Sequence, residues 1–150
     1  MNWTHTLAAA AALGLTAPLP VLAQEAPSSE AAGMSREEVL KTATNLLGEP
    51  ITYPSDTAEI TTEIVTLEPG GQTGYHTHQV PSWVHVLEGE VELRVDGAEP
   101  QRMAAGQVFI EPQDVPMQAF NVAEEPTRMM VVSIGAEGQP TGQPATPVSE

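Results

Sequence analysis

Gly74-Tyr75-His76-Thr77-His78 is the stretch that most strongly decides how this sequence is interpreted. In a β-strand successive side chains point to opposite faces, so His76 and His78 project to the same side, close together. Neighbouring imidazoles suit a divalent metal ion. The chain has only four histidines, and His5 lies in a segment that we expect to be removed. The pair therefore predicts a pocket for a metal ion or a small ligand.

Short strands are expected on both sides of this pair. Residues 60–67 are rich in β-branched side chains, and residues 91–95 alternate between apolar and polar types. Turns containing glycine or proline separate them from further expected strands at residues 82–88, 99–104, 107–111, 117–121 and 128–134. Short strands with regular turns and no long helix predict an all-β sandwich or small barrel, with room inside for one ligand.

The same residues resemble the cupin superfamily, which consists of small β-barrels of the jelly-roll type. Its two motifs are matched, at the family's spacing, by Gly70, His76, His78, Gly89, Gly106, Pro112 and Asn121. The resemblance covers residues 58–134 and implies a single cupin β-barrel. Because cupins often pair, it also implies a homodimer as a candidate assembly.

The resemblance implies a metal site that this chain keeps only in part. In metal-dependent cupins the ligands are two histidines and a glutamate of the first motif and a histidine of the second. Here Ser82 stands at the glutamate position and Met117 at the second-motif histidine position, while Asp114 replaces a glycine. Two imidazoles alone hold a divalent ion weakly, because such an ion normally needs three or four protein donors. The sequence therefore does not support a standard iron or manganese cupin dioxygenase.

Two hypotheses name further ligands that would bind a metal ion together with His76 and His78. In the first, Glu111 or Gln72 supplies an oxygen donor, although side chains of these types more often face solvent. In the second, Met117 is itself a ligand, and a His-His-Met set suits copper better than iron or manganese. Methionine also commonly fills space in cores, which favours a packing role for Met117. The identity of a bound divalent metal ion stays open between these sets.

In a third hypothesis no metal binds, and His76 and His78 hydrogen-bond a small organic ligand. The aromatic residues expected to line such a pocket are Tyr75, Trp83, Phe109 and Phe120. Strand parity places His85 on the face opposite Ser82, as a surface or interface residue. No catalytic residue is assigned. A metal-dependent cupin enzyme of the oxygenase or isomerase type, and an interaction module without pocket chemistry, remain alternatives to a binding protein.

Residues 1–23 have the features of a secretory signal peptide. An apolar Ala/Leu run covers residues 7–15, and small residues precede the expected mature start at Gln24. The run is shorter than the roughly 20 residues that span a bilayer, and Pro18 and Pro20 interrupt it. We therefore expect a periplasmic or secreted protein with no membrane anchor after cleavage.

The mature chain is expected to have three parts. Residues 24–57 form an N-terminal tail and arm, in which a capping pattern from Ser35 favours a short helix and a Thr-rich run favours an extra strand. Residues 58–134 form the barrel. Residues 135–150 contain prolines and few apolar side chains, which predicts a disordered C-terminal tail.

Composition narrows the range of partners. The formal net charge is −15, with five Lys and Arg against 20 Asp and Glu, so nucleic acid and anionic membranes are poor partners. Cysteine is absent, so an exported form relies on its hydrophobic core rather than on disulfides. These features leave a small-molecule ligand as the expected partner.

Overall fold

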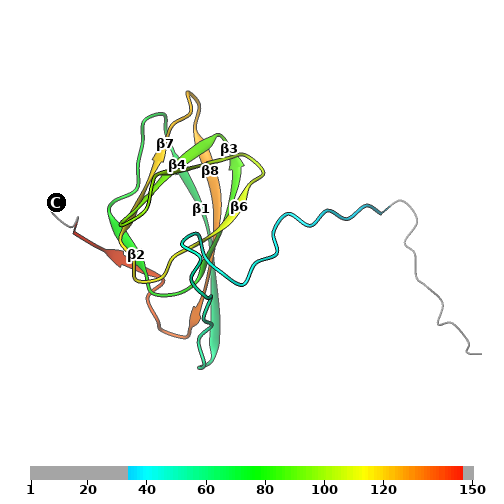
Figure 1. The fold of residues 1–150 in the computed structure, drawn as a ribbon, viewed down its shortest axis with the longest axis vertical. Coiled ribbons are helices and arrows are strands. Elements are labelled where there is room, and N and C mark those ends of the chain that lie inside the picture. Colours follow the sequence, from blue (N-terminus) through cyan, green and yellow to red (C-terminus); the bar gives the residue numbers. More distant parts are fainter. Residues whose placement is uncertain (1–33, 147–150) are drawn as a thin grey trace, which may run out of the picture. The chain divides into compact units, whose positions relative to one another are not determined.

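The computed structural model describes residues 34–146 of the chain, and its strands form two antiparallel sheets (Figure 1). The four-stranded sheet has the order β1-β8-β3-β6, with strands at Ala58–Leu67, Thr127–Ala136, Ser82–Glu88 and Val108–Glu111. The five-stranded sheet has the order β5-β4-β7-β2-β9, with strands at Gln101–Ala104, Glu90–Val95, Met117–Asn121, His76–His78 and Gly142–Pro144.

The all-β fold expected from the sequence is confirmed. Every pairing within the two sheets is antiparallel, and the longest joins β1 to β8 from Ala58 opposite Ala136 to Leu67 opposite Thr127. Each strand expected from the sequence is present, with ends shifted by a few residues at most. Two sheets built from strands far apart in sequence, facing each other across one core, are typical of a jelly-roll barrel.

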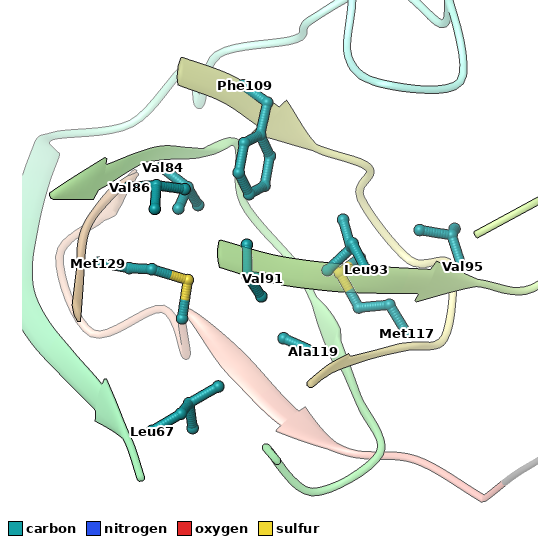
Figure 2. Packing of buried hydrophobic residues seen from close by; sticks show 10 residues of the cluster. All are labelled: Leu67, Val84, Val86, Val91, Leu93, Val95, Phe109, Met117, Ala119 and Met129. Carbon is teal, nitrogen blue, oxygen red and sulfur yellow. The ribbon is translucent and has the colours of Figure 1, made fainter. Parts of the chain in front are cut away.

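Alternate residues of both sheets point inward and form one hydrophobic core (Figure 2). Strands β1, β3, β6 and β8 contribute from one sheet, and β4 and β7 from the other. The buried members of this core are Leu67, Val84, Val86, Val91, Leu93, Val95, Phe109, Met117, Ala119 and Met129. Each fully buried Val or Leu side chain stabilises the fold by about 1.5–3 kcal/mol, so this core holds the sheets together without disulfides.

Neither the short helix nor the extra strand expected within residues 35–47 is present in the described part of the chain. The Oδ1 atom of Asn45 accepts a hydrogen bond from the backbone N–H of Leu47 at 2.9 Å, which forms a tight local turn. The N–H of Leu46 donates to the carbonyl of Ile110 at 3.0 Å, so the arm follows the edge of β6. Both expectations were wrong, because these bonds compete with the helical and strand pairings of the same backbone groups.

The C-terminal segment expected to be disordered from residue 135 is structured through residue 146. β8 continues past residue 135, and β9 pairs with β2, with Gly142 opposite His78. Backbone hydrogen bonds make the pairing of β9, and these need no apolar side chains. The expectation failed because it relied on the lack of a hydrophobic pattern.

Several expectations concern residues outside the described range. The signal peptide at residues 1–23, the tail at residues 24–33 and the last residues, 147–150, all lie there. Residues 34–146 contain no helix that is long and apolar enough to cross a membrane. Export of the protein stays a prediction from the sequence.

A buried polar network joins the ends of β1, β7 and β8. Asn121 donates through Nδ2 to the carbonyl of Leu67 at 2.9 Å and accepts the hydroxyl of Thr127 at 2.8 Å. Gly89, in the adjacent turn between β3 and β4, has a φ of +79°, and a Cβ placed on it would lie 2.9 Å from the Cα of Thr127. Only glycine suits this position, since any side chain would meet both the left-handed backbone and the neighbouring strand.

Replacing Gly89 should therefore destabilise the fold more than replacing a glycine with the same backbone conformation and open space around it. Gly97 is that control, with a φ of +75° and no atom within 4 Å of the position that a Cβ would take. We expect Gly97→Ala to lower the free energy of unfolding by about 1–2 kcal/mol. Gly89→Ala should cost a further 1–3 kcal/mol, roughly, from overpacking against Thr127. Urea unfolding measures both, and equal losses would contradict the proposed contact.

Candidate functional site

The short strand β2 places two imidazoles side by side. It lies between β7 and β9, with His76 directly opposite Met117 of β7. The ring centroids of His76 and His78 are 4.9 Å apart, and the rings meet edge to face at 83°. The arrangement expected from strand parity is therefore present.

Backbone carbonyls hold the Nδ1 atoms of both rings. His76 Nδ1 lies 2.7 Å from the carbonyl oxygen of Gly74, and His78 Nδ1 lies 3.2 Å from that of Thr141. The hydroxyl of Ser82 is also 3.1 Å from His78 Nδ1. Because a carbonyl oxygen only accepts, we assign a hydrogen to each Nδ1. The Nε2 atoms are left for other partners, as in histidines that bind metals.

The two Nε2 atoms and the carboxylate of Glu111 form a chain of close contacts. Nε2 of His76 lies 3.2 Å from Nε2 of His78, which lies 3.0 Å from Oε2 of Glu111. Glu111 is only 6% exposed, and this oxygen has no well-aligned hydrogen-bond donor in the described residues, so the contact is chiefly electrostatic. A buried carboxylate needs a neighbouring positive charge, and His78 supplies one when its ring carries a second proton.

The strand register explains how Glu111 reaches this position. β3 and β6 pair with Ser82 directly opposite Glu111, so both side chains leave the same face of the sheet. Ser82 is fully buried, and its Oγ lies 3.2 Å from that of Ser133. The position where the resemblance implied a glutamate therefore holds a small serine, and a carboxylate enters the same region from the neighbouring strand.

Opposing effects set the pKa of His78. Burial of the ring lowers its pKa, while the close, negatively charged carboxylate of Glu111 raises it, as do the carbonyl of Thr141 and the charge of Glu63. The outcome is a pKa above the usual value of 6.5. In the metal-free protein, the charged form of His78 is therefore stabilised by the carboxylates around it.

An apolar cavity of about 420 Å³ adjoins the histidine pair. Both sheets supply its walls, through Val65, Val84, Val91, Leu93, Phe109, Ala119, Met129 and Val131. Its polar lining consists of Glu63, Thr73, Tyr75, His76, His78, Glu111 and Gln143. An apolar cavity with a few polar groups gathered at one side is the usual form of a small-molecule site.

Tyr75 lines this cavity and is held by Asp96. Its hydroxyl donates a hydrogen bond to the Asp96 carboxylate, and this bond raises the pKa of Tyr75 to about 12. The phenol is therefore protonated near neutral pH. Tyr75 acts as an oriented wall of the cavity rather than as a base.

The structure separates the other predicted ligands from the cavity. Met117 is fully buried in the hydrophobic core beside His76 and does not line the cavity. Gln72 is exposed, forms an isolated bridge with Phe120, and does not line the cavity either. Of the three candidates for a further ligand, Glu111 is the one that lines the cavity, and its Oε2 lies 3.0 Å from Nε2 of His78.

The expected aromatic lining is correct for only two residues. Tyr75 and Phe109 line the cavity. Trp83 instead packs edge to face against His85 at 5.8 Å, and Phe120 packs against an arginine guanidinium. The expectation for Trp83 and Phe120 was wrong because strand alternation sends both side chains to the outer faces of their sheets.

Glu63 was missed by the sequence analysis. It lies on β1 on the same face as Val65 and Leu67, and it lines the cavity. The spacing of Glu63, Val65 and Leu67, two residues apart, was the available signal, because such residues share one face of a strand.

Comparison with known families matches residues 63–133 to the cupin domain. The resemblance inferred from the two sequence motifs is thereby confirmed. A comparison with curated proteins gave no match.

Solved structures with the same fold include two enzymes. DMSP lyase DddQ from Ruegeria pomeroyi DSS-3 is 23% identical with a TM-score of 0.52, over 69% of this chain and 49% of that one. The oxalate decarboxylase of Lactobacillus farciminis is 22% identical with a TM-score of 0.51, over 60% of this chain and 27% of that one. This chain thus spans about half or less of the length of these proteins. At such identities the likeness shows the fold alone.

The contact between His78 and Glu111 makes a prediction about stability and pH. Because the pKa of His78 is raised in the folded state, the stability that this contact contributes is fully present below about pH 6.5 and is lost as the pH rises through the raised pKa. Removing the carboxylate with Glu111→Gln should flatten this part of the profile. Urea unfolding of metal-free protein between pH 6 and 9 measures the difference between variant and parent.

The matched control is His85→Gln, which changes a histidine on the outer face of β3. It should leave the His78 part of the profile intact. If Glu111→Gln and its parent lose stability in parallel over this pH range, the assigned contact is incorrect.

Proposed function

We propose that this chain, whose residues 63–133 form a cupin domain, binds a divalent metal ion through His76, His78 and Glu111. A small organic ligand would occupy the adjoining apolar cavity. The observation that carries this proposal is the chain of close contacts that runs from His76 through His78 to Glu111, three donor side chains that all line that cavity. Two imidazoles and a carboxylate are a ligand set that first-row transition metals accept.

The distances between the donors support a shared ion. Two donors that each lie about 2.1 Å from an ion, at angles of about 90° to 110°, are about 3.0 to 3.4 Å apart. The contacts of 3.2 Å between the two Nε2 atoms and 3.0 Å between His78 and Glu111 lie in this range. A charge-assisted hydrogen bond has a similar length. The distances therefore fit both arrangements, and the experiment has to show whether a metal ion displaces the second proton of His78.

The carbonyl contacts of the two rings also favour metal binding. A metal-binding histidine usually donates its other ring N–H to a carbonyl or carboxylate, which fixes the tautomer and the ring orientation. Gly74 and Thr141 supply such carbonyls to His76 and His78. The rings would need little reorientation before binding an ion.

Binding would nevertheless require local rearrangement. Across residues 34–146, no three His, Asp or Glu side chains are already gathered around one point as a metal centre. The contacts run as a chain with His78 in the middle, so His76 and Glu111 must turn toward a common point. A protonated imidazole does not bind metal, so we expect the affinity to rise with pH.

A bound ion would supply Lewis-acid or redox chemistry at its open coordination positions. The residues of the chain would orient the imidazoles through backbone carbonyls, hold one carboxylate out of water, and surround the ligand with apolar walls. These roles serve a binding protein and a metal-dependent enzyme equally. We therefore propose that the protein binds a metal ion and a ligand. If it also converts a substrate, that turnover should disappear in His76→Ala.

Elemental analysis and calorimetry test the metal site directly. The chain without its first 23 residues is purified without a His tag, stripped with a chelator and titrated with Zn(II), Mn(II), Fe(II), Co(II), Ni(II) and Cu(II). We expect one equivalent of at least one ion to bind. His76→Ala, His78→Ala and Glu111→Gln should each weaken binding by about 100-fold or more, because even outer-shell partners of metal ligands are worth about 10–100-fold.

Two control variants make this test specific. His85→Ala removes an imidazole from the outer face and should leave the affinity unchanged. Met117→Leu keeps the core volume and should also leave it unchanged. Unaltered binding by Glu111→Gln would remove Glu111 from the site. A loss of copper binding in Met117→Leu, with the binding of the other ions unchanged, would instead support the His-His-Met hypothesis.

A further inference from the structure

The cavity beside the histidine pair is lined by no lysine or arginine among the described residues. Three arginines of the two sheets are engaged elsewhere, in ion pairs with glutamates. Arg94 and Arg102 contact Glu92 at 2.7 and 3.1 Å, and Arg128 contacts Glu88 at 2.7 Å. No lysine or arginine of the described residues is therefore available in the cavity to pair with an anionic ligand.

Two carboxylates face the same cavity. Glu111 lies buried against His78, whereas Glu63 is an exposed residue of β1 that lines the cavity together with Val65. Glu63 lines the same cavity as His76 and His78, so a ligand in that cavity lies near its charge. Unlike Glu111, it has no ion-pair partner in the described part of the chain.

The formal charges of the metal ion and the two carboxylates show why Glu63 matters: Glu111 alone does not neutralise a divalent ion. A divalent ion carries +2 and Glu111 carries −1, which leaves +1 to attract an anion. Glu63 adds −1 and brings the sum to zero. The net charge of −15 over the whole chain adds a further repulsion for anions.

We infer that this cavity takes a small uncharged or cationic molecule with an apolar body, and that Glu63 is the residue that discriminates against anions. The inference rests on the proposed metal site, since it sets the charge that a ligand meets there. The apolar walls provide the binding surface, and a volume of about 420 Å³ is near the lower end of ligand cavities, which span about 300–1,000 Å³. One aromatic ring with a short substituent is of suitable size.

A set of probes with one shape and different charges tests this inference. Benzyl alcohol is neutral, benzylammonium is cationic and benzoate is anionic, and all three carry one phenyl ring. Binding to the metal-loaded protein is measured by ligand-observed NMR and by calorimetry. We expect benzyl alcohol and benzylammonium to bind at least tenfold more tightly than benzoate, roughly the effect of one nearby charge.

The variant Glu63→Gln should raise benzoate affinity about five- to tenfold and leave benzyl alcohol affinity unchanged. The matched control is Glu59→Gln, which removes the same charge from the same strand at a residue that does not line the cavity. Glu59→Gln should leave the ratio between the probes as in the parent protein. Folding is checked by the unfolding midpoint, and both changes are at exposed positions.

Metal content measured in the same samples separates the two proposals. If the protein holds one metal ion but benzoate binds as tightly as benzyl alcohol, the charge inference is overturned and the metal site stands. If Glu63→Gln and Glu59→Gln shift the probe ratio equally, Glu63 has no specific role. If no probe binds, the ligand cavity is rejected. If no metal binds, the proposed function fails, and with it the charge sum on which the inference depends.

Discussion

Burial of the Glu111 carboxylate is the constraint on which the rest of the site depends. Only 6% of this residue is exposed, and a carboxylate removed from water costs several kcal/mol unless a positive charge compensates it. No lysine or arginine lines the cavity, so among the described residues His78 is the side chain that can provide that charge. Either a proton on His78 or a metal ion shared with His76 meets this demand. The two solutions exclude each other, so the proposed metal binding would depend on pH.

Glu111 is buried in a fold that is tightly packed in one region of the barrel and has a cavity in another. Core side chains such as Val86 and Val95 fill the space between the sheets, while Asn121 satisfies polar groups of β1, β8 and the loop that precedes β8. At β2, by contrast, the chain pairs with the short β9 and places imidazoles and a cavity where apolar packing would otherwise continue. The packed region provides the stability that a hollow, charged region cannot provide for itself.

The sequence predicted what depends on local alternation, whereas for Glu111, which depends on register, it could only name a candidate among several. Strand positions and the shared face of His76 and His78 follow from a period of two residues. The contact of Glu111 requires that β6 pair with β3 so that Glu111 lies opposite Ser82, and no local pattern contains that register. The arm near Asn45 was wrongly expected to be a helix or strand because side-chain hydrogen bonds overrode a weak periodicity. β9 was missed because it is built from backbone pairing alone.

Met117 places an apolar side chain at a position where the family resemblance implies a polar metal ligand. The family resemblance implies a histidine at this position, and the register places Met117 directly opposite His76. The residue is fully buried and joins the hydrophobic core, so the core extends to the edge of the histidine pair. Loss of one polar donor there removes a group that would have needed a partner in a region of low dielectric. Ser82 also stands where the resemblance implies a glutamate, and it carries no charge. The carboxylates that line the cavity are therefore those of Glu111 and Glu63. In the proposed site, the net charge would then be set by Glu111 on β6 and Glu63 on β1, and not by the positions that carry the ligands in the cupin motifs.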